Sequence, residues 1–343
     1  MPATTETGLL GSFPSPDLFF ETATAYQRTA ALKTAVELDL FTAIGEGAAT
    51  AKALAERRTA TERGIRILCD YLTIAGFLVK LSDRYELTLD SATFLDRRSP
   101  AYLASAVEFL NSEAAMEGFS HLTDIVKHGM PEAVFGVLEP EHPVWVRFAR
   151  AMAPMMMMPA ELLGQLVGAP AGESWKVLDL AAGHGLFGVA IAQQNPNVRI
   201  VAVDWPNVLE VAAENAQRAG VADRHESLAG SAFEVEYGTG YHLALLTNFL
   251  HHFDAPTCER LLRKVVDALV EGGRAAILEF VPNVDRVSPA VPAGFSMTML
   301  GSTPGGDTYT YPEFESMCRN AGFGDVELHA LSPTFQHVVV ATR

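Results

Sequence analysis

A glycine-rich turn and a later pair of adjacent histidines are the parts of this chain whose residue types and spacing could do chemistry. The turn, GHGLFG at residues 183–188, follows an apolar run typical of a strand and opens a segment typical of a helix. Glycines at this spacing allow a tight turn and let backbone N–H groups approach a ligand. Asp204 follows Gly183 by 21 residues, at the end of the next predicted strand. Because an acid at that distance can accept hydrogen bonds from two ribose hydroxyls, the pattern predicts a ribose-bearing cofactor.

Asp179 bears on the choice of cofactor, because the glycine pattern alone suits NAD equally well. This residue lies on the first strand, just before the turn. A carboxylate there would repel a pyrophosphate, but it can accept a hydrogen bond from the ammonium group of an amino-acid ligand. S-adenosylmethionine carries a ribose, an ammonium group and a sulfonium cation, and it has no phosphate. We therefore expect S-adenosylmethionine and keep a hydride-transferring NAD enzyme as the less favoured alternative.

His251 and His252 follow a predicted strand at its carboxyl end, the edge where open α/β sheets bind ligands. Methyl transfer from a sulfonium to an oxygen acceptor requires that the acceptor be oriented and its proton removed. A histidine, with an ordinary pKa of about 6.5, suits that task near pH 7. Glu279 ends the next strand, so its carboxylate can hold the imidazole in one tautomer. The alternative is that both histidines are ordinary surface residues.

The elements that must position these residues alternate between strands and helices from Trp175 onward. Such an alternation predicts a parallel, doubly wound sheet. The last two strands are separated by a loop at Ser332-Pro333 that is too short for a helical crossover, so we expect an antiparallel hairpin at the sheet edge. The predicted strands are Lys176–Leu180, Arg199–Val203, His242–Asn248, Arg274–Phe280, Val326–Leu331 and Val338–Ala341, and the predicted helices are 185–194, 207–219, 256–270 and 312–321.

The chain before residue 171 has a mainly helical pattern. Within it, two short predicted helices, Thr50–Arg57 and Thr61–Ala75, are followed by two β runs, Phe77–Leu81 and Tyr85–Leu87, which is the order of a winged helix. One interpretation is a structural or dimer-forming module, and the other is a DNA-binding regulator. The arginines that would contact DNA are Arg57, Arg58, Arg63 and Arg66.

The composition favours the first interpretation. The chain has 343 residues, of which 49% are hydrophobic and 19% charged, so it can bury a large core and does not resemble a disordered protein. Its net charge of −16 repels nucleic acid and anionic membranes. The three cysteines show no disulfide or zinc spacing, and we find no export signal and no apolar stretch long enough to span a membrane. We therefore expect a cytoplasmic enzyme without a metal.

Five motifs in order resemble the plant-type family of S-adenosylmethionine-dependent O-methyltransferases as found in bacteria. They are KVLDLAAGHGLFGVAIAQQNP (176–196) with Val203-Asp204, GSAFE (230–234), NFLHHFD (248–254), EGGRAAILEFVP (271–282) and GGDTYTYPEFESMCRNAGF (305–323). The resemblance covers about Pro16 to Arg343. It implies an N-terminal winged-helix dimerisation domain at 1–110, a helical linker at 111–170 that contributes to the substrate pocket, and a class I methyltransferase domain with a Rossmann-like fold at 171–343. It also implies a homodimer.

The resemblance further implies roles for individual residues. The expected catalytic residues are His251 as general base and Glu279 as its partner. The expected cofactor-binding residues are Asp179, Ala181, Gly183, Gly185, Asp204, Trp205, Ser231, Ala232, Phe233 and Asn248. The sequence departs from the family at five positions. Ser231 replaces an adenine-binding Asp, His252 replaces an Asp beside the base, and His184 replaces a small residue. His242 starts a strand that commonly starts with Asp, and Thr308 stands where a second acid often orients the base.

Aromatic and methionine residues are candidates for an apolar acceptor site, because they form an adaptable wall for flat molecules. The expected substrate-binding residues are Phe148, Met152, Met156, His252, Phe295 and Met299. Phe148 and Met152 lie in a segment similar to the family's substrate-facing helix. The sequence thus predicts O-methylation of a hydroxyl on an apolar, aromatic small molecule, with S-adenosylhomocysteine as product. A C-methylating or non-methylating relative is the alternative within the fold.

Overall fold

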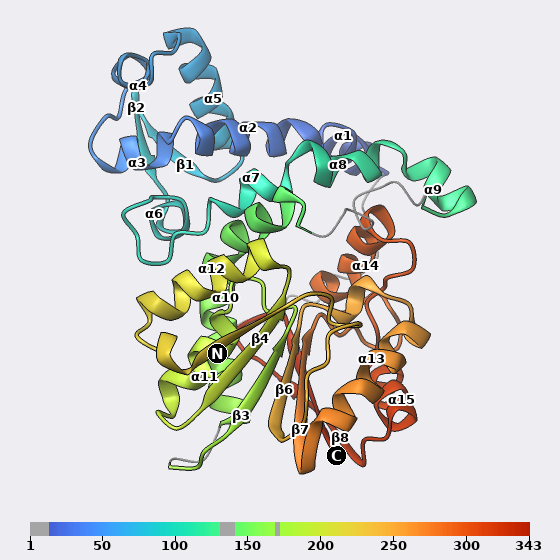
Figure 1. Cartoon of the computed structure of the whole chain (residues 1–343). Helices are drawn as coiled ribbons and strands as arrows, with labels where there is room; N and C mark the ends of the chain where they lie inside the picture. Colours follow the sequence, from blue (N-terminus) through green and yellow to red (C-terminus); the bar gives the residue numbers. More distant parts are fainter. Residues whose placement is uncertain (1–13, 131–140, 169–171) are drawn as a thin grey trace, which may run out of the picture. The chain divides into compact units, whose positions relative to one another are not determined.

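The computed structural model describes residues 14–130, 141–168 and 172–343 of the chain (Figure 1). These residues divide into two compact units, with the boundary between Val107 and Glu108, inside helix α7 (Ala106–Leu110). Each unit has its own apolar core. None of the helices in these ranges is both long and apolar enough to cross a membrane.

The N-terminal unit is helical apart from one small hairpin. Its α4 and α5 begin at Thr50 and Thr61, whose side chains accept the N–H groups of Ala53 and Gly64, and the hairpin β1–β2 follows them. The predicted order of two helices and a hairpin is therefore confirmed. The elements are α1 (Asp17–Ala23), α2 (Ala25–Glu37), α3 (Leu40–Gly45), α4 (Ala51–Arg58), α5 (Glu62–Ile74), β1 (Leu78–Leu81), β2 (Arg84–Leu87) and α6 (Leu89–Phe94).

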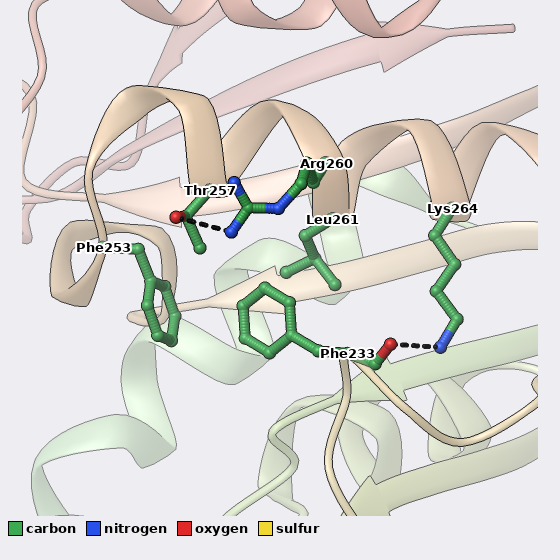
Figure 2. Close-up of a pocket in the computed structure, with 6 residues that line it drawn as sticks. All are labelled: Phe233, Phe253, Thr257, Arg260, Leu261 and Lys264. Carbon is green, nitrogen blue, oxygen red and sulfur yellow. Dashed lines mark hydrogen bonds between the residues drawn. The ribbon is translucent and has the colours of Figure 1, made fainter. Parts of the chain in front are cut away.

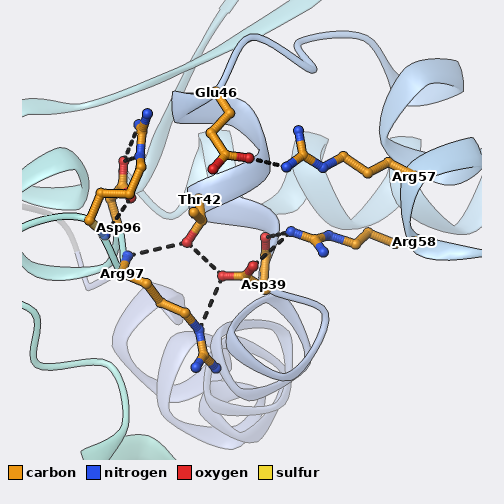
Figure 3. Close-up of polar contacts among 8 residues, drawn as sticks. Asp39, Thr42, Glu46, Arg57, Arg58, Asp96 and Arg97 are labelled. Carbon is orange, nitrogen blue, oxygen red and sulfur yellow. Dashed lines mark hydrogen bonds and ion pairs between the residues drawn. The ribbon is translucent and has the colours of Figure 1, made fainter.

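Ion pairs join the helices of this unit, as Figure 3 shows around Asp39. The Asp39 carboxylate lies 2.7 Å from Arg58 Nη2 and 3.2 Å from Arg97 Nε, and it accepts the Thr42 hydroxyl. Arg57 pairs with Glu46 and Arg66 with Asp70. Three of the four arginines considered for DNA binding thus pair with carboxylates of their own unit.

The second unit is built around a sheet with the strand order β5-β4-β3-β6-β7-β9-β8. The first five of these strands pair in parallel, and β9 pairs antiparallel with both β7 and β8. The parallel sheet and its closing antiparallel hairpin are therefore confirmed. The strands are β3 (Lys176–Leu180), β4 (Arg199–Asp204), β5 (His225–Ala229), β6 (Tyr241–Thr247), β7 (Leu269–Glu279), β8 (Asp325–Ala330) and β9 (His337–Thr342).

Helices cover both faces of this sheet (Figure 1). One apolar cluster packs α10 and α11 against it, and the other packs α13 and α15. Alternate residues of β3 serve the two clusters, with Val177 in the first and Leu178 and Leu180 in the second, as the period of two requires. The helices are α8 (Glu113–Ser120), α9 (Leu122–His128), α10 (Pro143–Val167), α11 (Leu186–Gln194), α12 (Pro206–Arg218), α13 (Ala255–Ala268), α14 (Ala290–Ser302) and α15 (Tyr311–Ala321), with short 3₁₀ turns at Ala222–Arg224 and Leu250–His252.

Two elements of this unit were absent from the sequence prediction. Strand β5 reads HESLA and lies at the sheet edge, where one neighbour is missing and polar residues are tolerated, so it shows no apolar run. Helix α14 carries Gly, Pro and Ser among its apolar residues, and these residues disfavour a helix locally. Both elements are stabilised by packing that a local pattern does not reveal.

Candidate active site

The glycine turn joins β3 to α11 in a backbone conformation that requires small residues. Ala181, Gly183 and Gly185 all have positive φ, at 50°, 56° and 71°. A side chain at Gly185 would come within 2.8 Å of the Ala212 Cβ. At Gly188, a Cβ would lie 2.8 Å from Ile200 and 2.9 Å from an Asp179 oxygen. The glycines of the motif therefore provide both the turn and the close packing of α11 on the sheet.

Asp204 links the ends of two strands at this edge. Its Oδ2 accepts the Gly183 N–H at 2.8 Å, and its Oδ1 accepts the Trp205 N–H at 2.7 Å. The sequence motif thus brings Asp204 against the glycine turn, as predicted from their spacing. Each carboxylate oxygen keeps a lone pair for another donor, such as a ribose hydroxyl.

Asp179 is fully buried below the turn. Its Oδ2 accepts the Gly188 N–H at 3.2 Å, whereas its Oδ1 has no hydrogen-bond partner among the described residues. Burial, against the effect of the Gly188 N–H and with a smaller contribution from the nearby Asp204, raises the pKa of Asp179 to about 8. Burial also raises the pKa of Asp204 to about 6, against the effect of the two N–H groups that it accepts. The described structure pairs neither carboxyl with a Lys, Arg or His, so this site suits a cationic ligand.

His184, inside the glycine turn, is also buried. Its Nδ1 accepts the Leu186 N–H at 3.2 Å, and Asn215 donates to its backbone carbonyl. Burial lowers the pKa of His184 to about 4, so the ring is neutral near pH 7. This histidine therefore shapes the turn without adding a positive charge to the site.

The segment Ser231–Phe233 follows β5 at the same edge of the sheet. The Gly230 N–H before it bonds to the backbone carbonyl of Asp204 at 2.9 Å, which places this segment next to Asp204. The Ser231 hydroxyl accepts the Phe233 N–H at 3.2 Å, Ala232 is buried, and Phe233 packs edge-on against Phe253. Trp205, the first residue after Asp204, is half-buried against a cluster on α10 and α12.

His251 and Glu279 form the most enclosed polar pair at this edge. The His251 Nδ1 lies 2.5 Å from Glu279 Oε2, and the two residues are 4% and 1% exposed. Glu279 Oε1 accepts the backbone N–H groups of Phe249, Leu250 and His251 at 3.0, 2.9 and 3.3 Å. A carboxylate held in this way favours the tautomer with hydrogen on Nδ1, which leaves Nε2 as a proton acceptor.

Aromatic rings surround the His251 imidazole. The His252 ring stacks on it with centroids 4.3 Å apart, and Phe295 of α14 meets it edge-on at 5.1 Å. Phe280, which the sequence analysis did not consider, stacks on Phe295 at 4.3 Å. Burial, together with the neighbouring His251, lowers the pKa of His252 to about 3, so this second imidazole is neutral.

The substrate-binding candidates on α10 and α14 have different neighbours. Met156 reaches the end of β6, where the Asn248 amide nitrogen is 3.5 Å from its sulfur. Phe148 packs edge-on against Phe109, and Met152 is buried within α10. Met299 is buried on α14. The described contacts do not join Phe148, Met152 or Met299 to His251.

Gln336 is a polar residue of the site that sequence reasoning missed. It is buried in the loop before β9, and its amide donates to the Asn248 side-chain oxygen. Asn248 has a positive φ of 54°, which is uncommon for residues other than glycine but is tolerated by Asn. Because 88 residues separate the two partners, no local pattern points to this contact.

The loop after α14 packs on the histidines. A Cβ at Gly306 would lie 2.2 Å from the His251 carbonyl oxygen, so this position requires glycine. Thr308 is buried, and the described hydrogen bonds do not include one from its side chain to His251. Arg286 holds the loop by pairing with Asp307 at 3.0 Å and with Glu313.

Comparison with known proteins identifies the family. A model described as an O-methyltransferase domain matches residues 119–324, and a model described as an O-methyltransferase dimerisation domain matches residues 20–97. The chain belongs to the O-methyltransferase family. It is therefore an S-adenosylmethionine-dependent O-methyltransferase, and its N-terminal unit carries the family's dimerisation domain.

Individual relatives extend this similarity over the whole chain. The chain is 27% identical to a 3-hydroxy-5-methyl-1-naphthoate 3-O-methyltransferase of Streptomyces sahachiroi, over 96% of this chain and 95% of that protein. It is 29% identical to a mitomycin biosynthesis 6-O-methyltransferase of Streptomyces lavendulae, over 85% and 84% of the two chains. A solved structure of a candidate O-methyltransferase from Nostoc punctiforme is 54% identical and superimposes with a TM-score of 0.92, over 97% of this chain and 100% of that one.

S-adenosylmethionine is the cofactor of this family, and the residues at the glycine turn fit it. The buried Asp179 Oδ1 lacks a partner, and the Asp204 carboxylate can accept further hydrogen bonds. These groups match the cationic methionine end and the ribose of such a ligand. The described residues include no cluster of three His, Cys, Asp or Glu side chains that could hold a metal ion. The three cysteines are buried and do not form disulfides.

Proposed function

We propose that this enzyme methylates a hydroxyl group on an aromatic small molecule and that His251 is the general base. The observation that carries the proposal is the buried contact between His251 Nδ1 and Glu279. A base that must accept a proton at Nε2 needs a fixed tautomer and a partner that stabilises the imidazolium formed. Glu279 supplies both, because it is itself fixed by three backbone N–H groups.

In this mechanism the chain's own residues position the reactants and move one proton. When bound, S-adenosylmethionine would supply the electrophilic methyl group, and breaking of the bond between this methyl and the sulfur would leave S-adenosylhomocysteine. Asp204 would hold the ribose, Asp179 the methionine end, and Ser231, Ala232 and Phe233 the adenine. His251 Nε2 takes the proton of the acceptor hydroxyl as its oxygen forms the new bond to carbon. The hydrogen bond to Glu279 then stabilises the charged imidazolium.

The aromatic surroundings of His251 support a flat, apolar acceptor. Phe295 and Phe280 form a stacked pair beside the imidazole, and Met156 reaches the adjacent end of β6. A phenol is a feasible substrate, since its pKa of about 10 leaves a proton for the base to remove. The relatives named for a hydroxynaphthoate and for mitomycin biosynthesis support the same class of acceptor.

We propose further that the enzyme acts as a homodimer, with domains at 1–110 and 171–343 and a linker at 111–170 that lines the acceptor site. The dimerisation-domain match and the exposed apolar side chains Leu18, Phe19 and Phe20 of α1 support this assembly. Light scattering at micromolar concentration should give twice the mass of one chain. A monomeric mass would refute the dimer without affecting the assignment of the base.

Transfer of a labelled methyl group tests the reaction. The purified enzyme is incubated with methyl-labelled S-adenosylmethionine and a panel of 1-naphthol, hydroxynaphthoic acids and substituted phenols, and the products are identified by mass spectrometry. We expect a methyl ether on at least one hydroxyl and no transfer to the matched compounds that lack it. A label found on ring carbon would identify a C-methyltransferase instead and would overturn this proposal.

A further inference from the structure

Lys264 of α13 directs its ammonium group at the turn that follows β5. Its Nζ lies 2.6 Å from the carbonyl oxygen of Val235, 3.0 Å from that of Phe233 and 3.4 Å from that of Ala232. A lysine ammonium has three N–H donors, so one side chain serves all three carbonyls. About 30 residues separate Lys264 from its partners, and no motif in the sequence marks it.

The turn has few other donors for these carbonyl groups. The N–H groups of Glu234 and Val235 both bond to the Ser231 carbonyl at 3.0 Å. In the described structure no backbone N–H reaches the carbonyls of Ala232, Phe233 or Val235, and the Tyr237 hydroxyl bonds only to that of Ala232. Without Lys264, two of the three carbonyls would turn to water, and the conformation of the turn would be less well fixed.

Figure 2 shows Lys264 at one end of a hollow on α13, with its Nζ bonded to the Phe233 carbonyl. The hollow has a volume of about 440 Å³, and its lining includes the rings of Phe233 and Phe253. Lys264 is half-buried, and its Nζ lies 4.2 Å from the centre of the Tyr237 ring. Burial lowers the pKa of Lys264, while the nearby Glu236 and Glu234 oppose that effect. The ammonium group is thus held against the turn by these contacts.

Arg260 provides a contrast on the same hollow. It lies one helical turn before Lys264, is exposed, and donates to the Thr257 hydroxyl of its own helix at 2.9 Å. Within the described part of the chain, Arg260 makes no hydrogen bond to the turn after β5. Arg260 therefore lines the same hollow without such a bond to the turn.

We propose that Lys264 is a positioning residue for adenine recognition, because it fixes the turn that carries Ser231, Ala232 and Phe233. The inference rests on the proposed assignment of this turn to the adenine. Ser231 stands where the family has an acid, and its hydroxyl already accepts the Phe233 N–H. With a short side chain at this position, recognition of the base depends more on the backbone shape of the turn.

Isothermal calorimetry with the full-length enzyme tests this role. The ligands are S-adenosylhomocysteine and S-inosylhomocysteine, which has a carbonyl in place of the 6-amino group. We expect the wild type to prefer the adenine compound. Lys264→Met should bind S-adenosylhomocysteine about 10-fold more weakly, the effect of losing one charge-assisted contact, and should discriminate less between the two ligands. Arg260→Met should bind both ligands as the wild type does.

The outcomes separate this proposal from the one on which it rests. If the wild type does not prefer the adenine compound, the assignment of the turn to adenine fails, and the role of Lys264 fails with it. If the wild type does prefer it but Lys264→Met is unchanged, or loses affinity equally for both ligands, only the role of Lys264 is overturned. If urea titrations of Lys264→Met show no cooperative unfolding transition, Lys264→Arg is used in its place. A planar guanidinium should fit the three carbonyls less well than an ammonium group, so Lys264→Arg should bind S-adenosylhomocysteine about 3-fold more weakly than the wild type. Wild-type affinity in Lys264→Arg would contradict the proposal.

Discussion

Carboxylates in the two units of this protein have opposite electrostatic surroundings. In the N-terminal unit, hydrogen bonds from Arg98 lower the pKa of Asp96, and Lys80 lowers that of Asp70. At the glycine turn of the second unit, burial raises the pKa values of Asp179 and Asp204 to about 8 and about 6. The first group is stabilised by cations of the protein, whereas the second is buried without one.

The difference separates carboxylates that stabilise the fold from the carboxyls that we propose to bind a ligand. A carboxylate that already has its cation contributes to folding and has little to offer a ligand. A buried carboxyl without a cation costs folding free energy, and a cationic ligand can offset that cost. Glu279 is a third case, because its partner is a histidine that can accept and release a proton.

The largest expected effect concerns the pair of His251 and Glu279. His251→Ala should lower kcat by about 10²–10⁴ and leave the affinity for S-adenosylhomocysteine nearly unchanged, since in the proposed mechanism the imidazole removes a proton and does not bind the cofactor. Steady-state kinetics and calorimetry measure the two effects. Glu279→Gln, which keeps an acceptor oxygen but removes the charge, should cost less. Wild-type turnover in His251→Ala would show that the base has been misassigned.

The next effect tests the unpaired acids at the cofactor site. Asp204→Ala should weaken S-adenosylhomocysteine binding by about 1.5–3 kcal/mol, the range for hydrogen bonds to a charged group. Calorimetry measures this loss directly, and Asp223→Ala, on an exposed 3₁₀ turn of the same unit, is the matched control. Equal affinities of Asp204→Ala and the wild type would contradict the assignment of Asp204 to the ribose.

A smaller effect appears in the pH dependence of the ligand-free enzyme. The Asp179 carboxyl has a higher pKa in the folded protein, about 8, than in the unfolded chain, so the folded state binds more protons between the two values. The contribution of Asp179 to stability should therefore be lost as the pH rises through about 8. A cationic ligand binds the ionised Asp179 carboxylate more tightly than the neutral acid. The rise in Tm caused by S-adenosylmethionine should therefore increase as the pH rises toward about 8.

Asp179→Asn sharpens this test, because an amide does not titrate. Thermal melts of the ligand-free variant should show a weaker fall in Tm with rising pH than the wild type, and the added stability with ligand should no longer grow. An unchanged pH profile in Asp179→Asn would show that another group causes the dependence.

The smallest expected effect is in the N-terminal unit. Asp96→Asn keeps an acceptor for the Arg98 N–H but removes the charge, so it should reduce the free energy of unfolding by about 1 kcal/mol at pH 7. Because folding lowers the pKa of Asp96, this loss should shrink as the pH falls from the pKa of an unfolded carboxyl toward the lower pKa of the folded state. Urea unfolding at pH 7 and pH 3 measures it. A loss of the same size at both pH values would point to packing instead of charge.

The sequence alone predicted the elements whose residues repeat in a clear local pattern. The buried parallel strands appear as apolar runs, and the glycine turn appears because only residues without large side chains tolerate its backbone. The order of motifs predicted that Asp204 meets the turn and that His251 and Glu279 end neighbouring strands, and both pairs are in contact. These predictions succeeded because parallel strands bring their carboxyl ends to one edge.

The tertiary structure alone decided which distant side chains complete the site. Lys264 and Gln336 are polar residues on a helix face and in a loop, where a sequence pattern indicates only exposure to solvent. Their partners, the carbonyls after β5 and the amide of Asn248, lie far away in the chain. The edge strand β5 and helix α14 were missed for the same reason. Local hydrogen bonding and hydrophobic period are encoded in neighbouring residues, whereas these contacts exist only once the sheet and its helices have packed.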